Sequence, residues 1–259
     1  MNALVERHVA LVGNPNCGKT ALFNLLTGSR QKVANYAGVT VERKEGRFVA
    51  PSGRTVRVLD LPGAYSLQAA SLDEAITFDV ISGRRADELA PELLVCVVDA
   101  TNLRLHLRFV LELLALGKPT IVAVNLMDVA RRRGIEIDLP RLQQELGVPV
   151  VDTVAVKHGG AQALIDLLDR QELPRLPPIS VSVDLHQRVR TLLAAAVRMP
   201  TQTARIDDAL DRWLLHPVAG LLTLAVIMFL IFQAVYAWAT PLMDLIDAGT
   251  AAIGEWVAA

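Results

Sequence analysis

Cysteine is scarce in this sequence of 259 residues, which contains only Cys17 and Cys96. Neither belongs to a C-x-x-C pair or a Cys/His cluster, which argues against a disulfide framework and a structural zinc site. The chain also lacks an excess of charge, because 26 basic residues face 27 acidic ones. Without a basic surplus we expect no nucleic acid as a partner. The N-terminus has charges and no long apolar stretch, so we expect no signal peptide.

A phosphate-binding pattern, G-x-x-x-x-G-K-[ST], is present at GNPNCGKT. Gly13 and Gly18 allow close backbone approach, so that the N–H groups between them can form a nest for anionic oxygens. Lys19 is placed to reach the β- and γ-phosphates of a nucleotide, and the Thr20 hydroxyl to bind Mg²⁺. The predicted nucleotide-binding residues of this stretch are Gly13, Asn14, Pro15, Asn16, Cys17, Gly18, Lys19, Thr20 and Ala21.

Short apolar runs alternate with amphipathic segments up to about Asp169, which is typical of a doubly wound α/β sheet. We predict strands at Val9–Val12, Val41–Val49, Thr55–Asp60, Leu93–Asp99, Thr120–Asn125 and Val148–Val154. We predict helices at Lys19–Thr27, Leu72–Ser82, Leu103–Leu116, Leu139–Glu145 and Ala161–Leu168. The turn signal Pro51-Ser52-Gly53 predicts a hairpin, and thus one antiparallel pair. The expected fold is a mostly parallel sheet with helices on both faces.

Two features that follow the phosphate loop have the groups needed to bind a metal ion and a γ-phosphate. Thr40 lies in a polar stretch between the first predicted helix and the second predicted strand, where its hydroxyl is placed to complete a Mg²⁺ shell. The sequence DLPG, from Asp60 to Gly63, ends a predicted strand. There the Asp60 carboxylate is placed to hold Mg²⁺ through water, and the Gly63 N–H to meet the γ-phosphate.

Two later features suit a guanine base. NLMD ends another predicted strand, and its Asp128 carboxylate is placed to accept the guanine N1–H and N2–H groups while Asn125 braces the loop. Further on, Ala155 is placed to offer its backbone N–H to the guanine O6. Each pattern alone has an ordinary explanation as a strand-to-turn sequence, but together they occur in the order that a nucleotide-hydrolysing site requires.

These five features resemble the five G motifs of the Ras-like, TRAFAC-class GTPases. The resemblance implies a Ras-like P-loop GTPase domain that binds GTP or GDP with Mg²⁺ held by Thr20, Thr40 and Asp60. It also implies catalytic roles for Lys19, Thr40, Gly63 and Asn16. In a subset of these GTPases the residue equivalent to Asn16 is associated with K⁺ near the phosphates, so we expect K⁺ there. The alternative is that Asn16 only forms hydrogen bonds within the loop.

Four positions depart from the common GTPase pattern. Leu126 stands where a lysine usually stacks on the base, and Val154-Ala155-Val156 replaces the usual Ser-Ala-Lys. We therefore expect weaker discrimination against other purine nucleotides. Ala64 stands where Ras-like enzymes place a glutamine that orients water, so we expect intrinsic hydrolysis to be slow.

A long apolar stretch lies near the C-terminus, because Leu214 to Met243 contains no Asp, Glu, Lys or Arg. This exceeds the roughly 20 residues that cross a bilayer, and a buried core helix seldom runs so long without a charge. Basic residues precede the stretch, namely Arg188, Arg190, Arg198, Arg205 and Arg212, whereas Asp244, Asp247 and Glu255 follow it. We therefore predict a transmembrane helix. The positive-inside rule predicts its orientation, with the nucleotide domain in the cytoplasm and the C-terminus across the membrane.

The wording of four stretches, GNPNCGKTALFNLLTG, NYAGVTVERKEG, DLPGAYSL and NLMD, is similar to the FeoB family of bacterial ferrous-iron transporters. LDRWLLHPVAGLLTL resembles the first transmembrane segment of that family. The resemblance implies a cytoplasmic GTPase domain at the bacterial inner membrane that regulates Fe²⁺ uptake. It also implies the lipid bilayer, small accessory Feo-type proteins and a homo-oligomer as partners, and switch loops around Ser29–Thr40 and Pro62–Ser71.

We accordingly expect a GTP-binding domain at residues 1–172, a short helical spacer at 173–212 with a helix at Val183–Val197, and the start of a membrane domain at 213–259. The family typically has a helical bundle where only about forty residues are available here. We also expect further membrane helices, and with them the iron path, to lie beyond this sequence. A membrane-anchored regulatory GTPase without a transport role is the alternative, whereas a ribosome-associated GTPase would carry a basic RNA-binding module instead of an apolar span.

Overall fold

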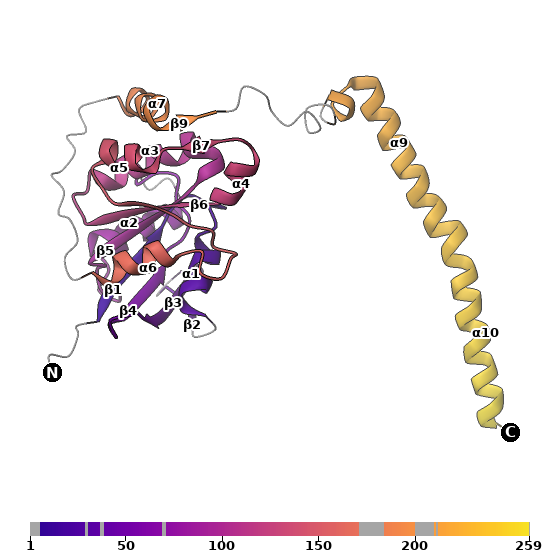
Figure 1. The fold of residues 1–259 in the computed structure, drawn as a ribbon. Helices are drawn as coiled ribbons and strands as arrows, with labels where there is room; N and C mark the ends of the chain where they lie inside the picture. Colours follow the sequence, from indigo (N-terminus) through magenta and orange to yellow (C-terminus); the bar gives the residue numbers. More distant parts are fainter. Residues whose placement is uncertain are drawn as a thin grey trace. The chain divides into compact units, whose positions relative to one another are not determined.

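A seven-stranded mixed sheet with the order β2-β3-β4-β1-β5-β6-β8 forms the centre of the first part of the chain (Figure 1). The computed structural model describes residues 6–28, 31–36, 39–68, 71–170, 184–199, 210 and 212–258. The strands are β1 (Arg7–Val12), β2 (Gln31–Asn35), β3 (Glu42–Val49), β4 (Thr55–Asp60), β5 (Leu93–Asp99), β6 (Thr120–Asn125) and β8 (Val150–Asp152). Strands β4, β1, β5, β6 and β8 are parallel, whereas β3 runs antiparallel to both β2 and β4.

Helices cover both faces of this sheet. They are α1 (Lys19–Thr27), α2 (Leu72–Ser82), α3 (Leu103–Leu114), α4 (Met127–Arg132), α5 (Leu139–Leu146), α6 (Gln162–Asp169) and α7 (Leu185–Ala196), with a 3₁₀ turn, η1 (Ala100–Asn102), ahead of α3. Helices α1 and α6 share one apolar core with alternate strand residues such as Val9 and Leu11. Helices α2, α3, α4, α5 and α7 share the other core with Ala10 and Val12. The near-continuous apolar strands therefore form because both of their faces are buried.

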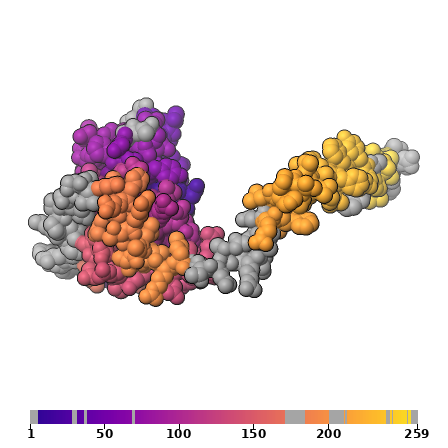
Figure 2. All heavy atoms as spheres, turned by 90° about the horizontal axis from the view of Figure 1, so that it is seen from above, coloured from indigo at the N-terminus to yellow at the C-terminus, as the bar shows by residue number. Residues whose placement is uncertain are grey.

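A small antiparallel ribbon joins α7 to the same body. β9 (Val197–Arg198) follows α7 directly and pairs with β7 (Glu136–Ile137). Val189 and Leu192 of α7 are buried in the core that also contains α3 and α5. Figure 2 looks onto this face, where the orange atoms of α7 lie across the magenta surface. Helix α7 is thus packed onto the domain that contains the seven-stranded sheet.

The chain divides into two compact units, Met1–Pro200 and Thr201–Ala259. The second unit contains α9 (Pro217–Gln233), a π-helical turn η2 (Ala234–Trp238) and α10 (Ala239–Ala258). Among the described residues, one helix is long and apolar enough to cross a membrane: it covers Pro217–Ala237, has a mean hydropathy of 2.5 and is not buried. Trp213 lies just before this helix, and its indole N–H donates to the hydroxyl of Thr223, inside the helix, at 3.2 Å.

The predicted fold class, a mostly parallel sheet with helices on both faces, is confirmed. The predicted hairpin at Pro51-Ser52-Gly53 is also present, between β3 and β4. The prediction of a single antiparallel pair was wrong, because β2 adds a second one on the outer edge. Strand β2 lies in the stretch that was predicted to be a polar loop ahead of Thr40. It is polar and largely exposed, so it has no apolar run by which a sequence pattern would reveal it.

Several boundaries and short elements also differ from the prediction. β3 begins at Glu42, β8 is confined to Val150–Asp152, and α3 ends at Leu114. Helix α4 and the β7–β9 ribbon were not predicted, because each is too short to show a period. The expected domain boundary at residue 172 and most of the expected spacer, residues 171–183 and 200–209, lie outside the described residues, as do parts of both expected switch loops.

Candidate functional site

The loop between β1 and α1 has the backbone geometry of an anion-binding turn. Gly18 adopts a φ of 83°, and a Cβ there would come within 2.2 Å of the Asn125 side chain. Gly13 has a φ of 151°, and a Cβ there would lie 2.4 Å from the Val97 carbonyl oxygen. Asn16 is one of two described non-glycine residues with a positive φ, at 64°. The loop is therefore pressed against the ends of β5 and β6 and requires glycine at both of these places.

Lys19, Thr20 and Asp60 form a compact polar cluster at the start of α1. The Lys19 ammonium lies 2.6 Å from Asp60 Oδ1, and the Thr20 hydroxyl donates to Asp60 Oδ2 at 3.0 Å. The Lys19 and Asp60 side chains are only 10% and 4% exposed. Strand β4 places Asp60 here because β1 and β4 are parallel and end at the same edge of the sheet. A cation donor, a hydroxyl and a carboxylate thus converge at the helix N-terminus.

Two adjoining cavities surround this cluster. One, of about 490 Å³, is lined by residues that include Lys19, Thr20, Thr40, Asp60 and Gly63. The other, of about 400 Å³, is lined by Asn14, Pro15, Asn16, Gly18, Lys19, Thr20, Ala21, Gly63 and Asp73. The structure therefore brings together, around these two cavities, every residue that the sequence predicted for phosphate and metal except Gly13 and Cys17.

Gly63 packs directly against the phosphate loop. A Cβ at this position would lie 2.9 Å from Pro15 Cγ and 3.0 Å from its nitrogen. The next residue, Ala64, is fully buried, and its N–H donates to the Gly13 carbonyl at 3.2 Å. Because Ala64 is enclosed in this way, its side chain offers no group to solvent near the cavity.

Two carboxylates that sequence reasoning missed hold the segment after Gly63. Glu74, on α2, accepts hydrogen bonds from the backbone N–H groups of Tyr65 and Ser66 at 3.1 and 3.3 Å. Glu112, on α3, accepts from the Ser66 hydroxyl at 2.8 Å and from the Leu67 N–H at 2.9 Å. Their positions in α2 and α3 give no signal of these contacts, because each carboxylate acts on a loop outside its own helix.

Asn125 connects three parts of the site. Its amide donates to the Cys17 carbonyl at 3.0 Å, and its Oδ1 accepts from the Ala155 N–H at 3.1 Å and the Thr153 hydroxyl at 3.3 Å. The side chain is completely buried. Asn125 thus joins the loop before α1 to the segment that contains Ala155, whose N–H donates to it. The bracing role predicted for Asn125 and the base contact predicted for Ala155 stay predictions.

Asp128 lies in the first turn of α4 and has unused hydrogen-bonding capacity. Its Oδ1 is buried without a hydrogen-bond partner in the described part of the chain. Its Oδ2 lies 3.4 Å from Arg132 and 3.8 Å from Lys157. Leu126, immediately ahead of α4, has a φ of 61° that side chains other than glycine seldom adopt. A buried acceptor without a donor is costly, so the carboxylate is suited to a ligand that carries N–H groups. Lys157 was not predicted.

The interior of the phosphate loop contains two further polar groups. Asn14 is 1% exposed, and neither of its side-chain polar atoms has a partner among the described residues. Cys17 is also buried, and burial, as the largest cause, raises the pKa of its thiol to about 11. At neutral pH Cys17 is therefore a neutral thiol, which argues against nucleophilic chemistry at this position.

Comparison with known proteins identifies the family to which this fold belongs. The family described as "Ferrous iron transport protein B" matches residues 7–168. This chain belongs to that family. The Fe(2+) transporter FeoB of Salmonella typhimurium is 49% identical over 166 residues, which cover 62% of this chain and 21% of the relative. The chain thus spans about a fifth of the length of the curated relatives that it matches.

Solved structures of FeoB domains are similar to a large part of this chain. The cytosolic domain of L. pneumophila FeoB has a TM-score of 0.66 and 31% identity, and the match covers 74% of this chain and 99% of that one. The cytosolic domain of T. maritima FeoB in its GMPPNP form has a TM-score of 0.57 and 38% identity, and the match covers 66% of this chain and 67% of that one.

Within the described residues of this chain, no three His, Cys, Asp or Glu side chains are grouped so that they could hold a metal ion.

Proposed function

We propose that this chain binds GTP and GDP with Mg²⁺ and hydrolyses GTP slowly. The observation that carries the proposal is the convergence of Lys19, Thr20 and Asp60 on a hollow that Thr40 and Gly63 also line. In the structure the Lys19 ammonium pairs with Asp60. In the proposed complex it pairs with the phosphates instead. The solved relative in its GMPPNP form supports a nucleoside triphosphate as the ligand.

The residues around Asp60 fit Mg²⁺ because they supply hard oxygen donors. The Thr20 hydroxyl is already within 3.0 Å of the Asp60 carboxylate, and Thr40 lines the same cavity. A few protein oxygens suffice, since Mg²⁺ in such sites takes its other ligands from phosphates and water. When bound, Mg²⁺ would neutralise charge on the phosphate oxygens. In this proposal Asp60 would hold the ion and Lys19 would bind the phosphates.

Asp128 would recognise the base in this proposal. Its unpartnered Oδ1 and its weakly held Oδ2 can accept two N–H groups of guanine together, with Asn125 fixing the loop geometry. Leu126 offers no charged stem for stacking, so we retain the expectation that other purine nucleotides are used measurably. Lys157 lies 3.8 Å from the same carboxylate, so it would also lie beside the bound base.

Hydrolysis would be slow because no side chain at position 64 can orient water. Ala64 is fully buried, so the segment contributes only backbone groups, including the Gly63 N–H. We also propose that K⁺ at Asn16 supplies positive charge beside the phosphates. Asn16 is exposed and lines the cavity that Lys19 and Thr20 share. Its side chain is thus free to add an oxygen ligand.

The wider proposal is that the first unit is the cytoplasmic GTPase part of an inner-membrane Fe²⁺ importer, whose nucleotide state gates or drives transport. Family membership supports it, since the relatives are named Fe(2+) transporters. The apolar helix Pro217–Ala237 would then lie in the lipid bilayer. Contacts with accessory Feo-type proteins, a homo-oligomer and the domain limits of 1–172, 173–212 and 213–259 belong to the same proposal.

Equilibrium titration of the detergent-solubilised chain with GDP tests the binding part directly. We expect one nucleotide per chain, and a loss of affinity on the order of a hundredfold in Lys19→Ala. Arg133→Ala serves as the control, because Arg133 is exposed and has no ion-pair partner in the described part of the chain. Equal affinity in all three proteins would contradict the proposed site.

A further inference from the structure

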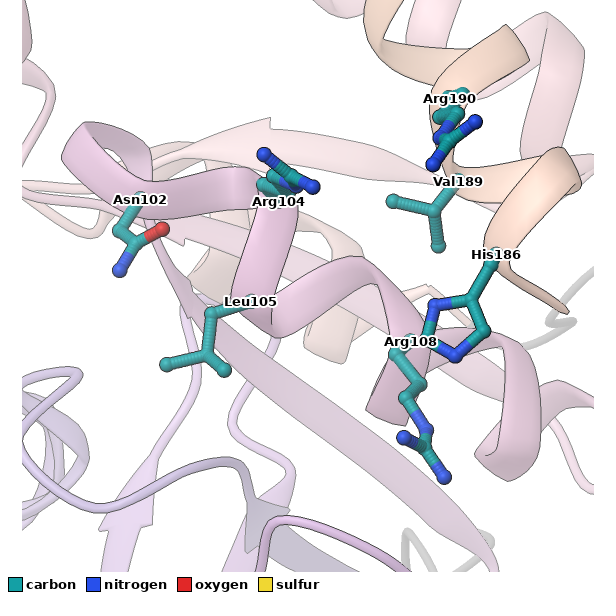
Figure 3. A pocket seen from close by; sticks show the side chains of 7 residues that line it. All are labelled: Asn102, Arg104, Leu105, Arg108, His186, Val189 and Arg190. Carbon is teal, nitrogen blue, oxygen red and sulfur yellow. The ribbon is translucent and has the colours of Figure 1, made fainter.

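A basic pocket of about 400 Å³ lies between α3 and α7, outside the proposed nucleotide site (Figure 3). Its basic side chains come from the two facing helices, with Arg104 and Arg108 on α3 and His186 and Arg190 on α7. Leu105 and Val189 add an apolar surface. No acidic side chain is among the lining residues. The proposed nucleotide binding uses none of these residues.

The basic side chains are arranged in two pairs at the same helical spacing. Arg104 and Arg108 are four residues apart on α3, and His186 and Arg190 are four residues apart on α7, so each pair lies on one face of its helix. The like charges of Arg104 and Arg108 at this spacing destabilise α3. Arg104 and Arg190 have no ion-pair partner within the described ranges, and Arg108 pairs with Glu112 at 3.2 Å. The positive charge of the pocket is therefore largely uncompensated.

We propose that this pocket binds a phosphate-bearing anion. Guanidinium groups bind phosphate oxygens in a planar, bidentate manner, and here they approach from two helices that converge on one hollow. The volume lies within the range of about 300 to 1,000 Å³ that is usual for small-molecule sites. Leu105 and Val189 would contact a less polar part of the ligand. The phosphate belongs either to a soluble phosphorylated compound or to the headgroup of an anionic lipid.

The pocket is connected to the loop that follows Gly63. The Arg108 guanidinium donates to Glu112 Oε1, and Glu112 Oε2 accepts from the Ser66 hydroxyl and the Leu67 N–H. An anion that draws Arg108 into the pocket removes a positive partner from Glu112 and alters its hold on this loop. The ligand would thereby change the rate of nucleotide hydrolysis. This regulatory part rests on the proposed function, whereas the binding part does not.

Binding is tested by calorimetric titration of the whole detergent-solubilised chain with inorganic pyrophosphate, in Mg²⁺-free buffer with saturating GDP to fill the phosphate loop. We expect affinity to fall on the order of tenfold in Arg190→Ala and in Arg104→Ala, since each removes one charge-assisted contact. Arg133→Ala, which removes an equal charge elsewhere, is expected to bind as wild type does. Equal affinity in all four proteins would overturn the proposal, as would no binding of pyrophosphate or of the second probe described below.

A second probe, glycerophosphoglycerol, distinguishes the two sources of phosphate. Tighter binding of this headgroup than of pyrophosphate, lost in Arg190→Ala, supports a lipid ligand, and the reverse order supports a soluble one.

The regulatory part is tested by measuring GTP hydrolysis with and without the tighter probe. We expect at least about a twofold change in wild type that is absent in Arg190→Ala and Glu112→Gln. Binding without any change in rate would overturn the regulatory part alone. A chain that never hydrolyses GTP would contradict the proposed function, while the titration would still decide whether the pocket binds phosphate.

Discussion

Lys19 and Asp60 form an ion pair of 2.6 Å between two motifs that lie 41 residues apart in the sequence. Both side chains are nearly buried, and the Thr20 hydroxyl bonds the second carboxylate oxygen. The residues proposed to bind phosphate and metal are thus already assembled and neutralise one another. A nucleotide bound with its cation would replace this ion pair by two new ones. The phosphates would pair with Lys19 in place of Asp60, and the cation would pair with Asp60 in place of Lys19.

Replacing Asp60 with asparagine removes the negative charge on which this exchange depends. We expect Asp60→Asn to lower the Mg²⁺-dependent rate of GTP hydrolysis roughly a hundredfold or more, because the metal loses its carboxylate. Steady-state phosphate release at several Mg²⁺ concentrations measures the effect. Asp87→Asn, which alters an exposed pair with Arg85, is the control and should retain the wild-type rate; an unchanged rate in Asp60→Asn would contradict the assignment.

A methyl group at position 63 has no space beside the phosphate loop. The Cβ of Gly63→Ala would meet Pro15 at about 3 Å, so the loop must move away from the phosphates. We expect at least about a tenfold lower turnover while GDP still binds. Comparison of kcat with the GDP dissociation constant separates the two effects. Gly249→Ala, at a position with open space, should change neither, and full turnover in Gly63→Ala would rule out the proposed role.

The unpartnered oxygen of Asp128 makes a prediction about base specificity. Asparagine at this position presents an amide donor, which suits the C2 carbonyl of xanthine better than the C2 amino group of guanine. We therefore expect Asp128→Asn to bind GDP on the order of a hundredfold more weakly and xanthosine diphosphate more tightly than wild type. Competition binding measures both, with Asp152→Asn as the matched surface control. Unaltered GDP affinity would exclude Asp128 from the base site.

The K⁺ proposal predicts a difference between salts that depends on one side chain. Wild-type hydrolysis should be faster in K⁺ than in Na⁺ at equal ionic strength, and Asn16→Ala should remove the difference. Because Asn16 has a φ of 64°, Asn16→Gly is a useful second variant: it keeps the backbone geometry and should also lose the response. Equal rates of the wild type in both salts would leave Asn16 as a structural residue of the loop.

The sequence was sufficient to predict the elements whose patterns are long or strongly apolar. β4, β5 and β6 and helices α1 and α2 have the predicted limits, because buried strands and glycine-bounded helices carry local signals. Edge strand β2 and helix α4 were missed, since their stability comes from pairing and from the NLMD turn rather than from a period of their own.

The site was predictable where a motif is continuous and unpredictable where partners come from distant segments. GNPNCGKT and DLPG specify their own chemistry, so Lys19, Thr20 and Asp60 could be named together. The use of the Ala155 N–H by Asn125, and the hold of Glu112 on Ser66, depend on tertiary contacts between residues 30 and 46 positions apart. No spacing rule in the sequence reports such contacts.

Steady-state hydrolysis of GTP and ATP by the whole solubilised chain, with Mg²⁺ and in parallel with Lys19→Ala, tests the central claim most directly. The account predicts slow GTP turnover well below one per second, a measurable but smaller rate with ATP, and loss of both rates in Lys19→Ala. Absence of nucleotide hydrolysis and binding in the wild-type chain, or equal rates in Lys19→Ala, would contradict it.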